Sequence, residues 1–185
     1  MRNKKMVAAV AAVVVAAVII ALAYEGGNGR NAQLQNITIG SRAPDYGFLV
    51  ANGSTVNLSA YIGHPVLLWF VATWCSSCAQ GSEAINQNYQ FFRQHGIKIV
   101  ELELYRDLGY SGPAITSFVG SYAPAAWSNG TVIPAYAGYN MTAEYDPSGY
   151  LDIYYLIAAN GTILYISGSP SSTLGQLEAE INRAL

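Results

Sequence analysis

Apolar runs and alternating stretches divide the chain into segments of different character. An unbroken apolar run covers 6–23, and PVLLWFVAT at 65–73 has the length of one strand buried on both faces. Apolar positions alternate on both sides of an Asn-Gly-Ser turn within 45–63, which predicts a short hairpin. Helical spacing of apolar residues predicts a helix over 79–95, ended by Gly96.

The last part of the chain continues this succession of strands and helices. IKIVELELY at 97–105 predicts a strand, and 152–167 predicts a hairpin that turns at Asn160-Gly161. The closing segment 172–185 carries its apolar residues on one stripe, which predicts an amphipathic helix.

The middle of the chain, 106–150, has the least regular pattern. Residues 113–123 and 135–145 have helical character, and PAAWSNGTV at 124–132 is predicted to form a loop between them. The order of all these elements predicts an α/β domain with a central mixed β-sheet and helices on both of its faces.

The N-terminal segment 1–24 has the pattern of a membrane anchor or a signal sequence. Three basic residues precede the apolar run 6–23, which as a helix spans about 27 Å, close to the thickness of a hydrocarbon core. We expect it to cross the membrane once, with the N-terminus inside and the remainder outside the cytoplasm. Cleavage is the alternative, because Ala-Leu-Ala at 21–23 resembles a signal-peptidase site, and the protein would then be secreted.

The composition beyond residue 24 limits what the domain can bind. Residues 25–40 are rich in Gly and Asn and predict a flexible linker, and 41–185 has the length of one domain. The chain beyond residue 24 holds six Lys or Arg against eleven Asp or Glu, a formal balance of −5, so we expect no nucleic-acid partner. Six Asn-X-Ser/Thr sequences predict glycosylation of an exported chain, at Asn36, Asn52, Asn57, Asn129, Asn140 and Asn160.

Both cysteines of the chain lie in Trp74-Cys75-Ser76-Ser77-Cys78, between the predicted buried strand and the next helix. This order places Cys75 at a helix N-terminus, where free backbone N–H groups and the helix dipole stabilise a thiolate. Cys75 is therefore predicted to be the attacking nucleophile. Cys78 lies one turn later and is predicted to resolve the mixed disulfide, so that the pair forms a redox-active disulfide. Trp74, Ser76 and Ser77 form the surroundings of this predicted site.

Other uses of the cysteine pair fit less well. A structural disulfide usually closes a longer loop, because its entropic effect grows with loop length. Zinc requires four ligands, and His64 and His95 do not stand at a recognisable ligand spacing, so no metal site is predicted. Haem attachment would require a histidine at position 79, which is alanine.

Two stretches of the sequence carry a resemblance to a known family: RAPDYGFLVANGSTVNLSAYIGHPVLLWFVATWCSSC and, more loosely, YLIAANGTILY. Over residues 41–183 the chain resembles the membrane-anchored thiol–disulfide oxidoreductases of the TlpA/ResA type, within the thioredoxin-like superfamily. The resemblance implies a thioredoxin-like fold without a bound cofactor, with Cys75 as nucleophile and Cys78 as resolver. It also implies protein cysteine substrates, a membrane or exported electron donor, and a reducing role in haem or metal-site maturation.

The sequence departs from this family just before the predicted strand at 153. Proteins of this type carry a cis-proline there, facing the disulfide, whereas this chain has Leu151 and Asp152. A carboxylate that faced the cysteines would disfavour a thiolate and could itself take up a proton. The alternative is that Asp152 lies in a different loop and is solvated.

The chain also lacks an acid at the two places where relatives supply a proton acceptor. Gly81 stands where many relatives carry a glutamate, and Trp69 stands where thioredoxin carries a buried aspartate. Glu101 and Glu103 point to one face of the next predicted strand, so one of them is a candidate replacement. Such a pair is otherwise a solvated strand end.

A binding protein is the alternative to an enzyme. Copper metallochaperones of the Sco type are thioredoxin-like and use a longer cysteine spacing together with a distant histidine. Here only two residues separate Cys75 from Cys78, and 96–185 contains no histidine. The thiol–disulfide oxidoreductase is therefore the favoured hypothesis.

Overall fold

The computed structural model describes residues 37–185 of the 185-residue chain. The predicted membrane segment 6–23, most of the predicted linker 25–40, and Asn36 lie outside the described residues. Among residues 37–185, no helix combines the length and the apolar composition that a bilayer crossing requires.

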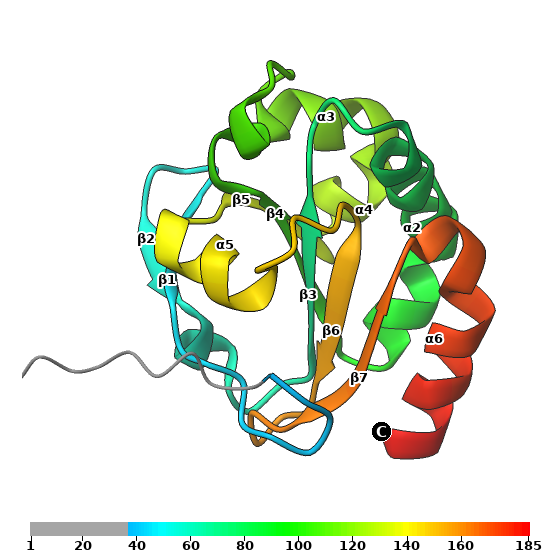
Figure 1. Cartoon of the computed structure of the whole chain (residues 1–185). Coiled ribbons are helices and arrows are strands. Elements are labelled where there is room, and N and C mark those ends of the chain that lie inside the picture. The colour runs from blue at the N-terminus through cyan, green and yellow to red at the C-terminus, as the bar shows by residue number, and fades with distance from the viewer. Residues whose placement is uncertain (1–36) are drawn as a thin grey trace, which may run out of the picture. The chain divides into compact units, whose positions relative to one another are not determined.

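Seven strands form one mixed sheet in the order β2-β1-β5-β4-β3-β6-β7 (Figure 1). The strands are β1 (Gly47–Val50), β2 (Thr55–Asn57), β3 (Val66–Val71), β4 (Lys98–Glu103), β5 (Val132–Tyr136), β6 (Ile153–Ile157) and β7 (Ile163–Gly168). The pairs β3–β4 and β4–β5 are parallel, whereas the other neighbours run antiparallel. The centre of the sheet is therefore parallel and its two edges are antiparallel hairpins.

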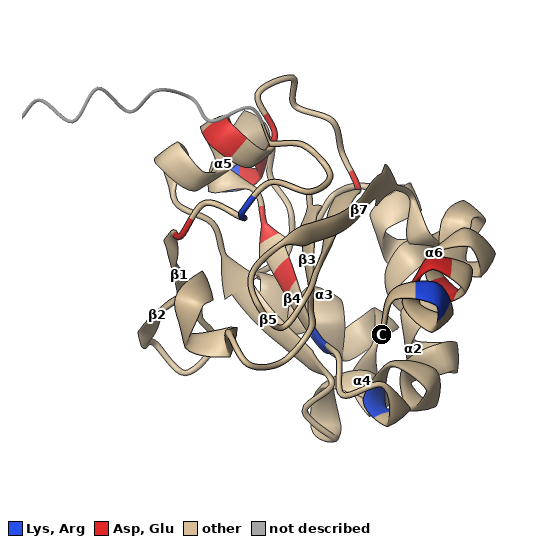
Figure 2. Cartoon of the chain, turned by 90° about the horizontal axis from the view of Figure 1, so that it is seen from below, with Lys and Arg blue, Asp and Glu red and all other residues tan. Residues whose placement is uncertain are grey.

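Helices cover both faces of this sheet (Figures 1 and 2). One face carries α2 (Ser76–Gln94), α3 (Ile115–Tyr122), α4 (Pro124–Ser128) and α6 (Pro170–Ala184), and the other carries α5 (Tyr139–Tyr145). Two short 3₁₀ segments, η1 (Leu58–Tyr61) and η2 (Tyr105–Gly109), complete the described elements.

The cysteine motif directly follows the central strand β3, which is fixed in the middle of the sheet. All six of its residues are buried, because β4 and β6 flank it and helices cover both faces. Its side chains alternate between two hydrophobic clusters, with Trp69 packed toward α2 and α6 and Phe70 packed toward α5. The fully buried run therefore delivers the residues after Val71 to a fixed point at the end of the sheet.

Several predicted elements are confirmed. The hairpin within 45–63 is the β1–β2 pair, and the hairpin at 152–167 is the β6–β7 pair. The helix predicted to end at Gly96 is α2, after which Gly96 takes the left-handed conformation with φ +67°.

The middle of the chain contains the main errors of prediction. The loop predicted at 124–132 is a short helix, α4, followed by a turn and the start of β5. The helix predicted at 135–145 begins only at Tyr139, because Ala135 and Tyr136 belong to β5. The predicted closing helix begins earlier, at Pro170, and Leu185 on its apolar stripe is 49% exposed.

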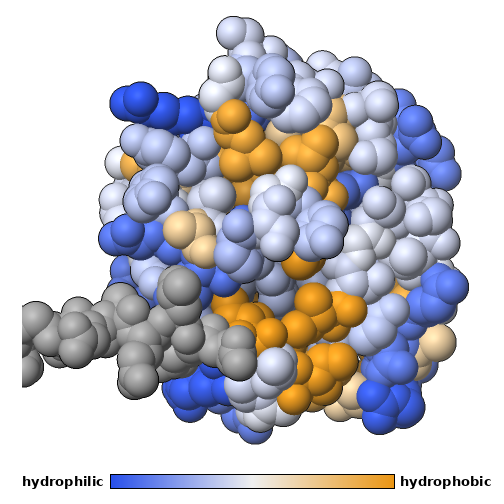
Figure 3. Space-filling model, viewed as in Figure 1, coloured by the Kyte–Doolittle hydropathy of each residue, from blue (hydrophilic) through white to orange (hydrophobic). Residues whose placement is uncertain are grey.

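Charged residues are sparse over this domain (Figure 2). They make up 11% of the whole chain. The face seen in Figure 1 is polar over much of its area, and its apolar side chains gather in separate patches (Figure 3). Four acidic residues are buried in the domain: Glu101, Asp107, Asp146 and Asp152.

Candidate redox site

The two cysteines lie where β3 gives way to α2. The Cys75 backbone N–H donates to the Ala72 carbonyl at 3.0 Å, and Cys75 is the N-cap residue of α2. Its Sγ accepts a hydrogen bond from the Cys78 backbone N–H at 3.3 Å. The sulfur therefore faces the unpaired amides of the first helical turn, the environment that the sequence predicts for a thiolate.

The two thiols differ in their access to solvent. Cys75 is 6% exposed and Cys78 is fully buried, and both are free. The Ser77 hydroxyl lies 3.1 Å from the Cys75 sulfur, so this serine adds a polar contact to the more accessible thiol. Ser76 is exposed and makes no such contact in the described part of the chain. An incoming disulfide can therefore reach Cys75 but not Cys78.

Asp107, in η2, holds the loop before the cysteines through hydrogen bonds from Thr73 and Trp74. Its carboxylate accepts hydrogen bonds from the Thr73 backbone N–H at 2.9 Å and the Thr73 hydroxyl at 2.6 Å. Its carbonyl accepts from the Trp74 indole N–H at 2.9 Å. Residues 106–108 of η2 all have positive φ, between 51° and 56°, and this left-handed run turns Asp107 toward the loop. Asp107 is not among the residues that the sequence predicts for the site.

Trp74 forms the exposed border of the site. It is 39% exposed, and its ring packs against Tyr110, with ring centroids 4.8 Å apart. Tyr110 itself is 67% exposed. The two rings therefore present an aromatic surface beside Cys75, in line with the predicted place of Trp74 in the site.

Asp152 lies inside the site and is not solvated, so that alternative is wrong. It stands directly before β6 and is fully buried, and its Oδ1 accepts a hydrogen bond from the Trp69 indole N–H at 2.9 Å. Burial raises the pKa of the Asp152 carboxyl. The Ser77 and Ser169 hydroxyls are close enough to oppose that shift, although neither forms a well-aligned hydrogen bond. Leu151, the preceding residue, is partly buried and packs against both core clusters.

Trp69 and Gly81, the two residues that stand where relatives carry acids, lie against each other. A Cβ at Gly81 would lie 2.8 Å from the Trp69 ring, so α2 can pass over that large ring only with glycine at this point. The Trp69 indole N–H points to Asp152, which supplies the buried acid from β6.

Glu101 belongs to the same buried group. It is fully buried, and its Oε1 accepts a hydrogen bond from the Ser82 hydroxyl of α2 at 2.5 Å. Burial raises the pKa of Glu101 to about 8, and the charge of Asp152 adds to the rise. The structure therefore corrects the alternative of a solvated strand end for this residue.

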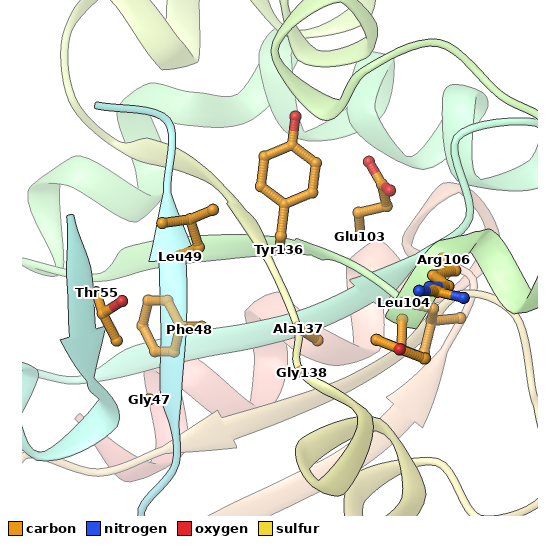
Figure 4. A pocket seen from close by; sticks show the side chains of 11 residues that line it. Gly47, Phe48, Leu49, Thr55, Glu103, Leu104, Arg106, Tyr136, Ala137 and Gly138 are labelled. Atoms are coloured by element: carbon orange, nitrogen blue, oxygen red, sulfur yellow. The ribbon is translucent and has the colours of Figure 1, made fainter. Parts of the chain in front are cut away.

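Glu103 lies two residues after Glu101 on the same face of β4, beside a cavity of about 490 Å³ that residues of β1, β5 and η2 also line. Figure 4 shows its carboxyl and the Tyr136 hydroxyl extending in the same direction from neighbouring strands, away from Phe48. Burial, with the nearby Asp107 charge, raises the pKa of Glu103 to about 7. The two candidate acceptors thus share one face of β4, as predicted, but have different neighbours: Asp152 influences the pKa of Glu101, and Asp107 influences that of Glu103.

Two further groups of predicted residues lie elsewhere. The described sequons, Asn52, Asn57, Asn129, Asn140 and Asn160, are all exposed at the surface. Within residues 37–185, no three His, Cys, Asp or Glu side chains converge in a way that could hold a metal ion.

The sheet order, the helices on both faces and the strand–Cys-X-X-Cys–helix unit define a thioredoxin-like domain. Solved structures share this fold. A thioredoxin-like protein from Aeropyrum pernix matches with a TM-score of 0.60 and 19% identity over 76% of this chain and 89% of its own. A thiol:disulfide interchange protein from Bacteroides sp. matches with a TM-score of 0.59 and 17% identity, over 80% and 93%. Copper-bound ScoI from Arabidopsis thaliana matches with a TM-score of 0.57 and 14% identity, over 77% and 99%.

Sequence comparisons identify relatives of this thioredoxin-like domain. The model of the AhpC/TSA family matches residues 39–107. The thiol-disulfide oxidoreductase ResA of Bacillus subtilis is 33% identical over 56% of this chain and 56% of its own length. ResA of Geobacillus kaustophilus is 31% identical over 37% and 39%. The match thus spans about half the length of these relatives or less. The chain thus has a thioredoxin-like fold and, over about half its length or less, is similar in sequence to ResA thiol-disulfide oxidoreductases.

Proposed function

We propose that this protein is a thiol–disulfide oxidoreductase that exchanges disulfides with protein cysteines through Cys75 and Cys78. The observation that carries the proposal is the N-cap position of Cys75, whose sulfur accepts the Cys78 amide and contacts the Ser77 hydroxyl. The likeness to ResA proteins supports the same chemistry.

The two thiols have different tasks in this mechanism. The Cys75 thiolate attacks a substrate disulfide, forms a mixed disulfide and releases one substrate thiolate. Cys78 then loses its proton and attacks the Cys75 sulfur, which breaks the mixed disulfide and releases the second substrate thiolate. The enzyme is left with a Cys75–Cys78 disulfide, and an electron donor must reduce it before the next cycle. The reverse sequence oxidises a substrate dithiol.

The substrate-facing surface is proposed to be the aromatic border of the site. Trp74 and Tyr110 lie beside Cys75 and offer exposed ring faces that can pack against an unfolded or extended polypeptide. Asp107 holds the backbone on which Trp74 stands, so this surface keeps its position relative to the sulfur.

We place the domain outside the cytoplasm, anchored by the segment 6–23 or secreted after its cleavage. The exposed positions of the five described sequons are compatible with glycosylation there. A membrane or exported protein would reduce the pair, and the domain would serve as a reductant in haem or metal-site maturation. Digestion by a protease added to intact cells tests the location, because a cytoplasmic domain would survive it.

Reduction of insulin disulfides by dithiothreitol tests the activity with a protein substrate. The wild-type full-length chain should accelerate insulin precipitation, Cys75→Ser should not, and Cys78→Ser should accumulate a mixed disulfide visible on a non-reducing gel. A wild-type rate equal to that of dithiothreitol alone, or equal to that of Cys75→Ser, would contradict the proposed function.

A further inference from the structure

The proposed mechanism requires a group that accepts the thiol proton of Cys78. Cys78 is fully buried, and burial, followed by the charge of Asp152, raises the pKa of its thiol. Its attack on the mixed disulfide requires loss of that proton inside the protein. A nearby group must therefore accept the proton, and the positions at which relatives carry an acid are Trp69 and Gly81 here.

Asp152 is fully buried directly before β6, and its two carboxyl oxygens have different surroundings. Its Oδ1 is held by the Trp69 indole N–H at 2.9 Å, whereas its buried Oδ2 has no hydrogen-bond partner among the described residues. Its backbone takes φ +75°, a left-handed conformation that costs free energy for a residue with a side chain. The Ser169 backbone N–H donates to the Asp152 carbonyl at 2.8 Å and secures that conformation. A buried oxygen that has only the poorly aligned Ser77 and Ser169 hydroxyls near it, on a residue with left-handed backbone, calls for a functional explanation.

We propose that Asp152 is the proton acceptor for Cys78, with Trp69 as the residue that positions it; this inference rests on the proposed exchange activity. During resolution the Cys78 S–H bond breaks and its proton passes to Oδ2. The sulfur lone pair forms the Cys75–Cys78 bond, and the Cys75–substrate S–S bond breaks with its electrons on the departing thiolate. The proton returns to Cys78 when the disulfide is reduced again.

The groups around Asp152 are consistent with this role. Cys78 of α2, Glu101 of β4 and Tyr154 of β6 interact electrostatically with it, and Ser77 and Ser169 offer hydroxyls. Within the described part of the chain, neither Asp152 nor Glu101 forms an ion pair with a Lys or Arg.

Asp152 fits the role better than Glu101 does. The pKa of Cys78 responds to the charge of Asp152, and Glu101 is not among the groups that shift it. Glu101 is held by Ser82, and its pKa of about 8 keeps it protonated at neutral pH. A protonated Glu101 leaves Asp152 free to ionise, because two adjacent carboxylates resist carrying charge together.

Reaction of the reduced full-length chain with Ellman's reagent separates the two sulfur steps. Cys75 releases the first thionitrobenzoate when it attacks, and Cys78 releases the second when it resolves the mixed disulfide. In Asp152→Asn, which preserves volume and an acceptor for Trp69, we expect the first phase to change by less than about twofold. The second phase should slow by about 100-fold, the usual contribution of a general base.

The sign of the change separates proton transfer from a merely electrostatic role. If Asp152 acted only through its charge, its removal would favour the Cys78 thiolate and would speed the second phase. Asp146→Asn is the matched control, because Asp146 is also buried, with an unpartnered Oδ2, but lies at the end of α5. That variant should retain both wild-type phases.

The pH dependence in the wild-type protein keeps the inference testable if Asp152→Asn does not fold. The second phase should rise with pH as Asp152 ionises and then level off. A tenfold rise per pH unit without a plateau, or a second phase that is equal to or faster than wild type in Asp152→Asn, would overturn the inference. Wild-type protein that releases thionitrobenzoate in neither phase would contradict the proposed function itself, whereas two phases unaffected by Asp152→Asn contradict only this inference.

Discussion

Replacing Asp107 by alanine should destabilise the domain and loosen the loop that carries the cysteines. The change removes two hydrogen bonds from Thr73, at 2.9 and 2.6 Å, to a carboxylate that is 5% exposed. Hydrogen bonds to charged groups contribute about 1.5–3 kcal/mol each. The left-handed φ of 51° adds about 1 kcal/mol, because alanine tolerates it less well than aspartate. We expect a loss of about 3–5 kcal/mol in the free energy of unfolding after partial rehydration.

Urea unfolding of the purified full-length chain, followed by tryptophan fluorescence, measures this loss. Thr73→Val removes only the hydroxyl bond and should cost about 1–2 kcal/mol, and the double variant should show that the two effects are not additive. Glu180→Ala, which breaks only the exposed pair with Arg183, is the control and should cost less than about 1 kcal/mol. A loss for Asp107→Ala within about 0.5 kcal/mol of zero would refute this account of the loop.

Three further predictions concern the surroundings of the cysteines. Ser77→Ala removes the 3.1 Å contact with the Cys75 sulfur and should slow the first phase with Ellman's reagent several-fold, while leaving the fold stable. Gly81→Ala gains helix propensity but places a Cβ 2.8 Å from the Trp69 ring, so chemical denaturation should show a net loss of about 1–3 kcal/mol. Because the folded-state pKa of Glu101 is about 8, its folded form binds a proton that the unfolded form releases above about pH 4.5. Stability should therefore fall as pH rises from about 4.5 to about 8, and Glu101→Gln should reduce that slope in unfolding measured across this range.

The parts of the fold that the sequence predicts well are those with strong local signals. The buried run of β3, the Asn160-Gly161 turn and Gly96 after α2 each act through a few neighbouring residues. Strand β5 was missed because its local signals point elsewhere. It contains Pro134, which is uncommon inside a sheet, and it becomes a strand only between β1 and β4.

In the candidate site too, features set by neighbouring residues are predictable, whereas contacts between residues far apart in the sequence are not. The spacing of Cys75 and Cys78 predicts their place at the start of α2, since that depends on adjacent residues. Asp107 lies 34 positions from Thr73, and no feature of its own segment predicts the left-handed run that turns it inward. The sequence shows directly that Trp69 and Gly81 stand where relatives carry acids. The contact between these two residues, and the hydrogen bond from the Trp69 indole to Asp152, depend on tertiary packing.

A redox titration is the most direct test of whether Cys75 and Cys78 form a redox-active disulfide. The full-length chain would be equilibrated in dithiol–disulfide buffers of graded potential, its free thiols alkylated, and the mass shift read for the peptide that holds both cysteines. We expect one reversible two-electron transition in which both thiols disappear together, at a potential below about −220 mV for a reductant. A folded protein whose two thiols fail to form a reversible disulfide would show that the pair is not an exchange site. A potential above about −150 mV would retain the exchange activity but contradict the proposed reducing direction.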